Sequence, residues 1–372
     1  MRRGITTYTT LRAALTSCIL CVLLLAFLSS AFFPALSLSV VTLSIMPVYL
    51  IMTGLIAGFV PLSICALGTL GCLALTGGTQ LMFFGALYLI PFLLVFVYGM
   101  VKRVNFWKLL GGIAGTLFLS QILIFLILQR ITDGRLYETA ANAVASFVES
   151  APGRDNVFYL FLQARLLGIP ESMVDTALVQ TGNHYVFSDE ATLELLKQLR
   201  SQVSGMLQSM LPSLLVSGSI LNSVMGLGFG QYFGQRSKRR RAVRLNEPEQ
   251  DIPTLDMPAL SAWHIPRPWG LRIGLLGVGY FMISFNAGDA VQLLGALMWQ
   301  VFATCYSLQG LAAIHYNQKM RGSSKFWRIA LIVASLMLSF MQTVLIIMGL
   351  MDQITNMRGL RPPREPRENR EE

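Results

Sequence analysis

Charged residues are the scarcest class in this sequence. Asp, Glu, Lys and Arg make up 13% of the 372 residues, and none of them occurs anywhere between Arg12 and Lys102. Soluble chains carry about 25% charged residues. A run this long without charge cannot cover a water-exposed surface, but it can hold several membrane helices of about 20 residues each. The sequence therefore predicts an all-α fold, a polytopic transmembrane helical bundle, and excludes an ordinary soluble protein.

Cysteine and histidine are also scarce, with five and three residues. All five cysteines lie in apolar segments, which is typical of small packing residues. Cys18 and Cys21 have the CxxC spacing of metal or redox sites, but no second pair and no histidine accompanies them. The chain contains no HExxH, GxSxG or GxxxxGK[ST] motif. We therefore expect no enzymatic activity, no metal and no cofactor.

Apolar segments divide the chain into about nine predicted spans, with eight to ten possible because their ends are uncertain. The predicted spans cover residues 12–33, 37–53, 55–75, 80–101, 108–129, 206–232, 270–286, 290–314 and 329–350. Basic residues of short loops stay on the cytoplasmic side of a membrane. When successive spans cross the membrane in opposite directions, the basic short loops of this chain all fall on the side of the N-terminus. This pattern predicts a cytoplasmic N-terminus.

A dense basic run follows the sixth predicted span. Its members are Arg236, Lys238, Arg239, Arg240, Arg241 and Arg244. Taken alone, the run would fit a nucleic-acid patch. Directly after a span, it more simply fixes topology and attracts anionic lipid headgroups, and no aromatic residues for stacking on bases are interleaved with it. We interpret it as a topology and lipid-headgroup contact and expect no nucleic-acid partner.

The spans and polar segments predict six parts of the chain. These are a first five-span bundle at 1–129, an extracytoplasmic amphipathic-helical insertion at 130–205, the sixth span at 206–235, a basic cytoplasmic loop at 236–269, three further spans at 270–351 and a disordered charged tail at 352–372. Within the insertion, Val157 to Leu162 are too few to span a membrane. We expect them to be buried against the bundle or to dip into the membrane interface. The pair Ser188 and Asp189 predicts a helix start.

Small residues recur at intervals of four along the sixth span. The glycines of this ridge are Gly218, Gly226, Gly230 and Gly234. Such a ridge lets a neighbouring helix approach backbone to backbone. Intramolecular packing, self-association and docking of another membrane subunit are all compatible with it.

Uncharged amide side chains lie within the predicted spans and could converge on a cavity. The candidate ligand-binding residues are Gln80, Gln121, Asn222 and Gln300. Buried polar groups in a bundle mark substrate paths, although single amides also join helices. The sequence supports either interpretation.

Several short segments in the second half resemble a known family. They are Leu211-Pro212-Ser213-Leu214-Leu215, Ile220-Leu221-Asn222, Trp263-His264-Ile265-Pro266, Gln309-Gly310-Leu311-Ala312, and Gly349-Leu350-Met351-Asp352 with Arg358 after it. These segments resemble the YybS-like bacterial membrane proteins, which contain domain of unknown function 2232. That family is similar in fold to the substrate-binding subunits of energy-coupling-factor vitamin transporters. The resemblance implies a bundle with a ligand pocket near the outer face, and a multi-pass protein of the bacterial cytoplasmic (inner) membrane.

Two functions follow as hypotheses. The first is a transport-related membrane protein with a small molecule or lipid bound in the helical bundle. The alternative is a membrane assembly or scaffold protein, which recruits partner subunits or a second copy of itself through the glycine-rich helix face.

Overall fold

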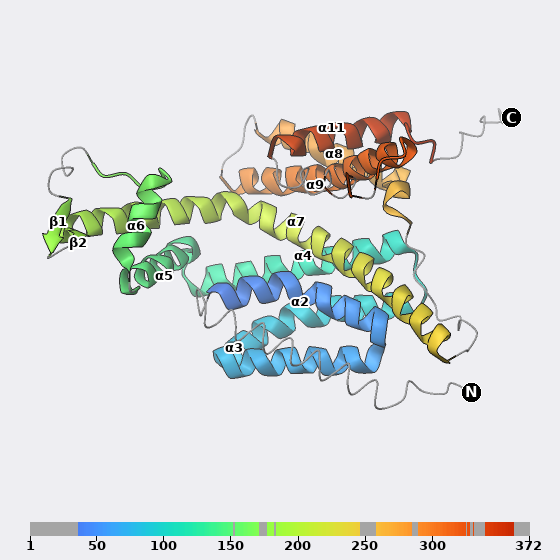
Figure 1. The fold of residues 1–372 in the computed structure, drawn as a ribbon, viewed down its shortest axis with the longest axis horizontal. Coiled ribbons are helices and arrows are strands. Elements are labelled where there is room, and N and C mark those ends of the chain that lie inside the picture. The colour runs from blue at the N-terminus through green and yellow to red at the C-terminus, as the bar shows by residue number, and fades with distance from the viewer. Residues whose placement is uncertain are drawn as a thin grey trace. The chain divides into compact units, whose positions relative to one another are not determined.

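The structure is a computed structural model that describes residues 36–151, 153–170, 177–181, 184–245, 258–284, 289–324, 326–327, 330 and 339–360. Helices dominate this part of the chain (Figure 1). They are α2 (Leu36–Ala57), α3 (Phe59–Val101), α4 (Phe106–Ile131), α5 (Leu136–Ser150), α6 (Arg154–Gln163), α7 (Asp189–Leu245), α8 (Arg267–Ser284), α9 (Asp289–Met320) and α11 (Ser339–Thr355). The helical class predicted from the sequence is confirmed.

Within the described residues, 4 stretches are long and apolar enough to cross a membrane. They are Gly78–Val101, Phe106–Ile131, Asp189–Gln235 and Val291–Met320, and shorter apolar helices lie at Met46–Ile56, Phe59–Leu75 and Met341–Thr355. Most of the predicted span 55–75 and all of the span 80–101 fall within α3, on either side of Gly78, whose φ of 70° and ψ of −168° interrupt the helix. Glycine adopts such a backbone conformation without steric cost. The first predicted span, 12–33, lies outside the described residues.

Contacts divide the chain into two units. Unit 1 comprises residues 1–46, 63–92 and 116–211, and unit 2 comprises residues 47–62, 93–115 and 212–372. Several of the long helices contribute a segment to each unit. We describe the two units separately.

Unit 1 contains the predicted insertion, which has a hydrophobic core of its own. Phe158 of α6 is fully buried there, against Phe187 at a ring-centroid distance of 6.1 Å. Buried residues of α5 and α7, among them Ala145 and Leu195, complete this core. The sequence led us to expect that Val157 to Leu162 pack on the bundle or enter the membrane interface. The structure shows a third arrangement, in which α6 packs inside the insertion.

The insertion also contains two strands that an all-α prediction did not include. β1 (Leu178–Thr181) and β2 (His184–Phe187) pair antiparallel, with Thr181 opposite His184. The next helix begins where the sequence predicts, since α7 starts at Asp189 and the backbone N–H of Ala191 donates to Ser188 Oγ at 3.3 Å. The serine thereby satisfies one of the free amides at the helix start.

Two segments differ from their predicted character. Residues 236–245 of the predicted basic loop continue α7, and a 3₁₀ turn, η2 (Leu260–Ala262), lies farther along the same loop. The predicted charged tail begins at Asp352, yet α11 runs to Thr355, and both Asp352 and Arg358 are buried. Opposite charges allow this burial, because each neutralises the other where neither could be buried alone. The rest of the tail, 361–372, lies outside the described residues.

In unit 2, α9 packs against both α8 and α11. Glycines permit the close approach of α9 and α11. A Cβ atom placed on Gly310 would meet the carbonyl of Leu345, and one placed on Gly349 would meet the carbonyl of Tyr306. Backbones of two membrane helices can come this close only where side chains are missing.

Candidate functional site

Four uncharged polar side chains of α7 and α9 form a cluster inside unit 2, which we call the hydroxyl–amide cluster. Its members are Ser213, Ser217, Gln300 and Thr304. In each helix the two members are four residues apart, so both side chains lie on the same face. One predicted ligand-binding residue, Gln300, is thus placed among hydroxyl groups.

The hydrogen bonds of this cluster form a chain. The Gln300 Nε2 amide donates to Ser217 Oγ at 2.8 Å and to Ser213 Oγ at 3.2 Å. Ser217 Oγ lies 2.8 Å from Thr304 Oγ1, with either hydroxyl as the donor. Both N–H groups of the amide are therefore used. Within an apolar bundle such bonds offset the cost of burying polar groups.

One more hydroxyl lies close to the cluster in the sequence of α9. Ser307 is three residues after Thr304, on the same side of the helix. Its Oγ atom is buried and has no hydrogen-bond partner among the described residues. A buried hydroxyl without a partner costs free energy, and this one is available for a water molecule or a ligand.

The other predicted ligand-binding residues do not all lie in this unit. Gln80 and Gln121 belong to unit 1, where Gln80 is exposed and Gln121 Nε2 donates to the Tyr88 hydroxyl at 3.2 Å. Asn222 belongs to unit 2 and is buried in α7, with 9% of its surface exposed. Two of the four candidate amides, Gln80 and Gln121, therefore belong to unit 1, and the other two, Asn222 and Gln300, belong to unit 2.

The glycine ridge of α7 packs against α2 of the same chain. A Cβ atom on Gly226 would lie 2.8 Å from Ile51 Cδ1, and one on Gly230 would lie 3.2 Å from Met52 Cα. Gly234 faces the Leu55 carbonyl at 3.4 Å. Around Gly218, in contrast, no described atom outside the adjacent backbone of α7 lies within 4 Å of the added Cβ. The basic residues from Arg236 to Arg244 belong to the last turns of α7, but their side chains lie outside what the structure describes.

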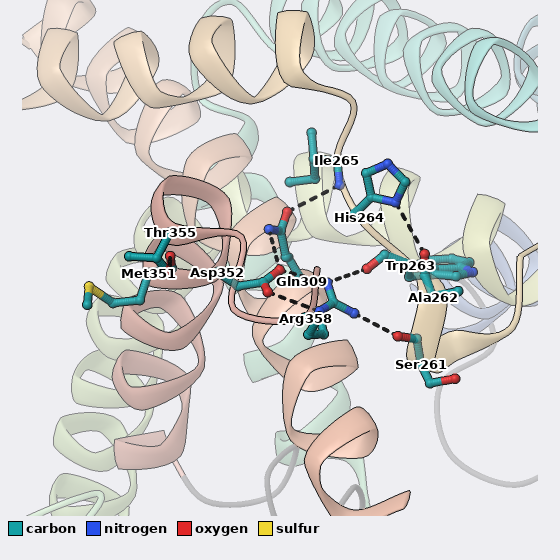
Figure 2. A network of polar contacts seen from close by, with 10 residues as sticks. All are labelled: Ser261, Ala262, Trp263, His264, Ile265, Gln309, Met351, Asp352, Thr355 and Arg358. Carbon is teal, nitrogen blue, oxygen red and sulfur yellow. Dashed lines mark hydrogen bonds and ion pairs between the residues drawn. The ribbon is translucent and has the colours of Figure 1, made fainter. Parts of the chain in front are cut away.

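A second polar group in unit 2 involves residues that no site prediction included. We call it the Arg358 node, and it consists of Gln309 of α9, Asp352 of α11 and Arg358 just after α11 (Figure 2). Arg358 Nη2 lies 2.7 Å from Asp352 Oδ2, and Arg358 Nε donates to Asp352 Oδ1 at 3.1 Å. The side chains of this ion pair are only 2% and 4% exposed. Such a two-point contact is the strongest arrangement for an arginine and a carboxylate.

The node also holds the segment that precedes α8. Arg358 Nη1 donates to the Ser261 carbonyl at 3.0 Å, and Arg358 Nη2 donates to the Trp263 carbonyl at 2.6 Å. Gln309 completes the network, since its Nε2 donates to Asp352 Oδ2 at 2.9 Å and its Oε1 accepts from the Ile265 N–H at 3.2 Å. Figure 2 shows the guanidinium bound to Asp352 and to the two carbonyls, with Gln309 bound to Asp352 and Ile265 beside it.

Three of the segments that carry the family resemblance meet at this node. They are Trp263 to Pro266, Gln309 to Ala312, and Gly349 to Asp352 with Arg358. The sequence indicated that Asp352 lies near a span end, but only the fold reveals its partner six residues later. The signal for this pair was the single carboxylate at the end of the apolar run, because a carboxylate that is buried there requires a counter-charge.

Within the part of the chain that the structure describes, no three His, Cys, Asp or Glu side chains gather as metal ligands would. The chemistry of both polar groups is thus that of hydrogen bonds and one ion pair. The hydroxyl–amide cluster can recognise an uncharged polar group, whereas the Arg358 node has its charges paired internally.

Comparison with known proteins identifies the family. Searches of curated proteins and of solved structures found no match. The family model described as "Predicted membrane protein (DUF2232)" matches residues 156–353, which is more than half of the 372-residue chain. The match includes the hydroxyl–amide cluster together with Gln309 and Asp352, and several helices of the chain are long and apolar enough to cross a bilayer. The chain therefore belongs to the DUF2232 family of membrane proteins, and it is embedded in a lipid bilayer.

Proposed function

We propose that this protein is transport-related and binds a small uncharged polar molecule, or the polar part of a lipid, at the hydroxyl–amide cluster. The observation that carries the proposal is the buried Ser307 hydroxyl, one turn from Thr304, which has no hydrogen-bond partner among the residues that the structure describes. Polar groups facing the interior of a membrane bundle are typical of substrate paths. The cluster members and Ser307 carry no formal charge, which favours a neutral ligand.

Further support comes from the resemblance to the YybS-like bacterial proteins and, in fold, to vitamin-binding transporter subunits. In this proposal the protein lies in the bacterial inner membrane with its N-terminus in the cytoplasm, and it performs no chemical step. The ligand would be recognised by hydrogen bonds to hydroxyl and amide groups, with the surrounding apolar side chains excluding water.

The test uses Ser307→Ala in the full-length, purified protein. A panel of vitamins, nucleosides and lipids is added, and the ligand-induced shift of the melting temperature is measured. Ser307→Ala should leave the melting temperature of the ligand-free protein unchanged or slightly raised, because the lost hydroxyl bonds to no described residue. The shift caused by the active compound should become smaller.

The matched control is Ser219→Ala. Ser219 Oγ donates to the Leu215 carbonyl of the same helix at 2.7 Å and lies outside the cluster. Its replacement should leave the ligand-induced shift intact. The proposal fails if no compound of the panel shifts the unmodified protein and native mass spectrometry finds no bound small molecule, or if both alanine variants respond as the unmodified protein does.

The alternative function is the recruitment of partner subunits through the glycine-rich face. Its support is weaker, since α2 of the same chain already packs on Gly226, Gly230 and Gly234. Gly218 is the ridge position at which an added Cβ meets no described atom of another segment within 4 Å. If Gly218→Leu abolishes a cross-linked partner while the protein still folds, the assembly function is favoured over ligand binding.

A further inference from the structure

The Arg358 node connects two parts of the chain that the linear order of spans leaves unrelated. One part is the segment from Ser261 to Ile265, which leads into α8. The other is the chain after α11, represented by Arg358. Hydrogen bonds of 2.6 Å and 3.0 Å from the guanidinium to the Trp263 and Ser261 carbonyls require that both parts lie at the same place.

Aromatic contacts bring a third segment to this place. Trp263 lies 5.6 Å from both Phe106 and Trp107, between ring centroids, and His264 lies 6.4 Å from Trp107. Phe106 is the first residue of α4 and follows the turn that joins α3 to α4. All of these residues belong to unit 2. The turn before α4, the segment before α8 and the end of α11 are therefore neighbours.

Positive charge marks this end of unit 2. Exposed basic residues lie in the turn before α4 and at the starts of α4 and α8, namely Lys102, Arg103, Lys108 and Arg267. Basic residues beside membrane spans are retained on the cytoplasmic side. Tryptophan is enriched at membrane–water boundaries, which agrees with Trp107 and Trp263 at the same place.

We infer that the chain leaves α11 on the cytoplasmic side, the same side as the turn before α4 and the segment before α8. The protein then crosses the membrane an even number of times between Ile265 and Arg358. Of the eight to ten crossings that the sequence allows, this inference favours an even total, with both termini in the cytoplasm. The Arg358 node fixes this arrangement because it joins the two ends of the α8 to α11 region by charge and hydrogen bonds.

In this assignment, the buried ion pair holds the chain after α11 at the cytoplasmic end of unit 2. Arg358 comes three residues after α11 ends at Thr355. Pairing with Asp352 shields its charge from the apolar surroundings, while the two backbone carbonyls use further N–H groups of the guanidinium. A lysine could not replace it, since an ammonium group lacks the planar fork that contacts a carboxylate and two carbonyls together.

The experiment is cysteine labelling of the full-length protein in its own membrane with a membrane-impermeant maleimide. Three single substitutions are compared: Glu372→Cys in the tail, Lys102→Cys in the turn before α4, and Glu149→Cys on α5, which follows α4 on the opposite side. The chain with only its own five cysteines provides the background. Labelling is measured on spheroplasts, in which the cytoplasmic membrane is intact, and again after lysis.

The expected result is that Glu372→Cys and Lys102→Cys react only after lysis, while Glu149→Cys reacts in intact spheroplasts. If Glu372→Cys reacts together with Glu149→Cys, the inference is wrong. None of these three substitutions removes a residue of the Arg358 node, so the labelling does not depend on a variant that loses the bonds of the node. As a second measurement, Arg358→Lys should lower the melting temperature as clearly as Arg358→Gln, and an unchanged melting temperature in both would contradict the role given to the node.

Discussion

The insertion in unit 1 and the α8–α9–α11 group in unit 2 are held together by different forces. The insertion buries large apolar side chains, such as Phe158 and Leu195, away from water. The α8–α9–α11 group relies on glycine contacts between backbones and on the buried Arg358 node. The hydrophobic effect drives the first, but lipid tails are as apolar as leucine and remove that drive between membrane helices. Close backbone contact and polar pairing therefore replace it.

The largest expected effect is the loss of one partner of the Arg358 node. Arg358→Ala leaves Asp352 buried without its counter-charge, which typically costs about 3–5 kcal/mol. The measurement is thermal unfolding of the purified protein in detergent. Arg272→Ala is the matched control, because Arg272 is exposed and lies over the Trp269 ring at 5.6 Å. Equal melting temperatures for these two variants would show that the node does not stabilise the fold.

A core substitution in the insertion should have an effect of comparable size that stays local. Phe158→Ala removes a fully buried ring and should cost about 3 kcal/mol. Tyr159→Ala is the matched control, since the neighbouring tyrosine is 58% exposed. Hydrogen exchange should accelerate in α5 and α6 of the first variant and remain slow in α9. Faster exchange throughout both units would mean that the insertion has no stability of its own.

A smaller effect is expected from filling the glycine contact between α9 and α11. Gly349→Ala places a methyl group against the Tyr306 carbonyl, and overpacking of this kind costs about 1–3 kcal/mol. Gly111→Ala is the control, because its added Cβ meets no atom of the described segments outside the adjacent backbone of α4 within 4 Å. The melting temperature should fall for Gly349→Ala alone. A similar fall for both variants would point to helix propensity rather than to the close approach.

The sequence predicted most helices of the fold but fewer of its contacts. A charge-free run between Arg12 and Lys102 is sufficient for apolar helices, because chain composition alone decides whether a segment tolerates lipid. The β1–β2 hairpin was missed although Gly182 and Asn183, between two short β-prone segments, are a known signal for a tight turn. Each strand has only four residues, so the helical periodicity of the flanking segments outweighs this short signal.

The two polar groups of unit 2 could be predicted to different degrees. Gln300 was recognisable as an amide inside an apolar segment, but the identity of its partners depends on how α7 and α9 pack. The pairing of Asp352 with Arg358 and Gln309 depends on three segments far apart in the sequence. Hydropathy locates such residues along the chain and carries no information on which helices become neighbours.

The smallest effect on stability is expected at the hydroxyl–amide cluster, which contrasts with the Arg358 node of the same unit. Gln300→Leu removes hydrogen bonds between membrane helices, which are worth about 0.6 kcal/mol on average. The melting temperature should therefore change little, in contrast to Arg358→Ala. If the cluster serves a ligand rather than the fold, the same variant should lose the ligand-induced shift almost completely. A large fall in melting temperature with an intact ligand response would instead mean that Gln300 acts as a link between α7 and α9.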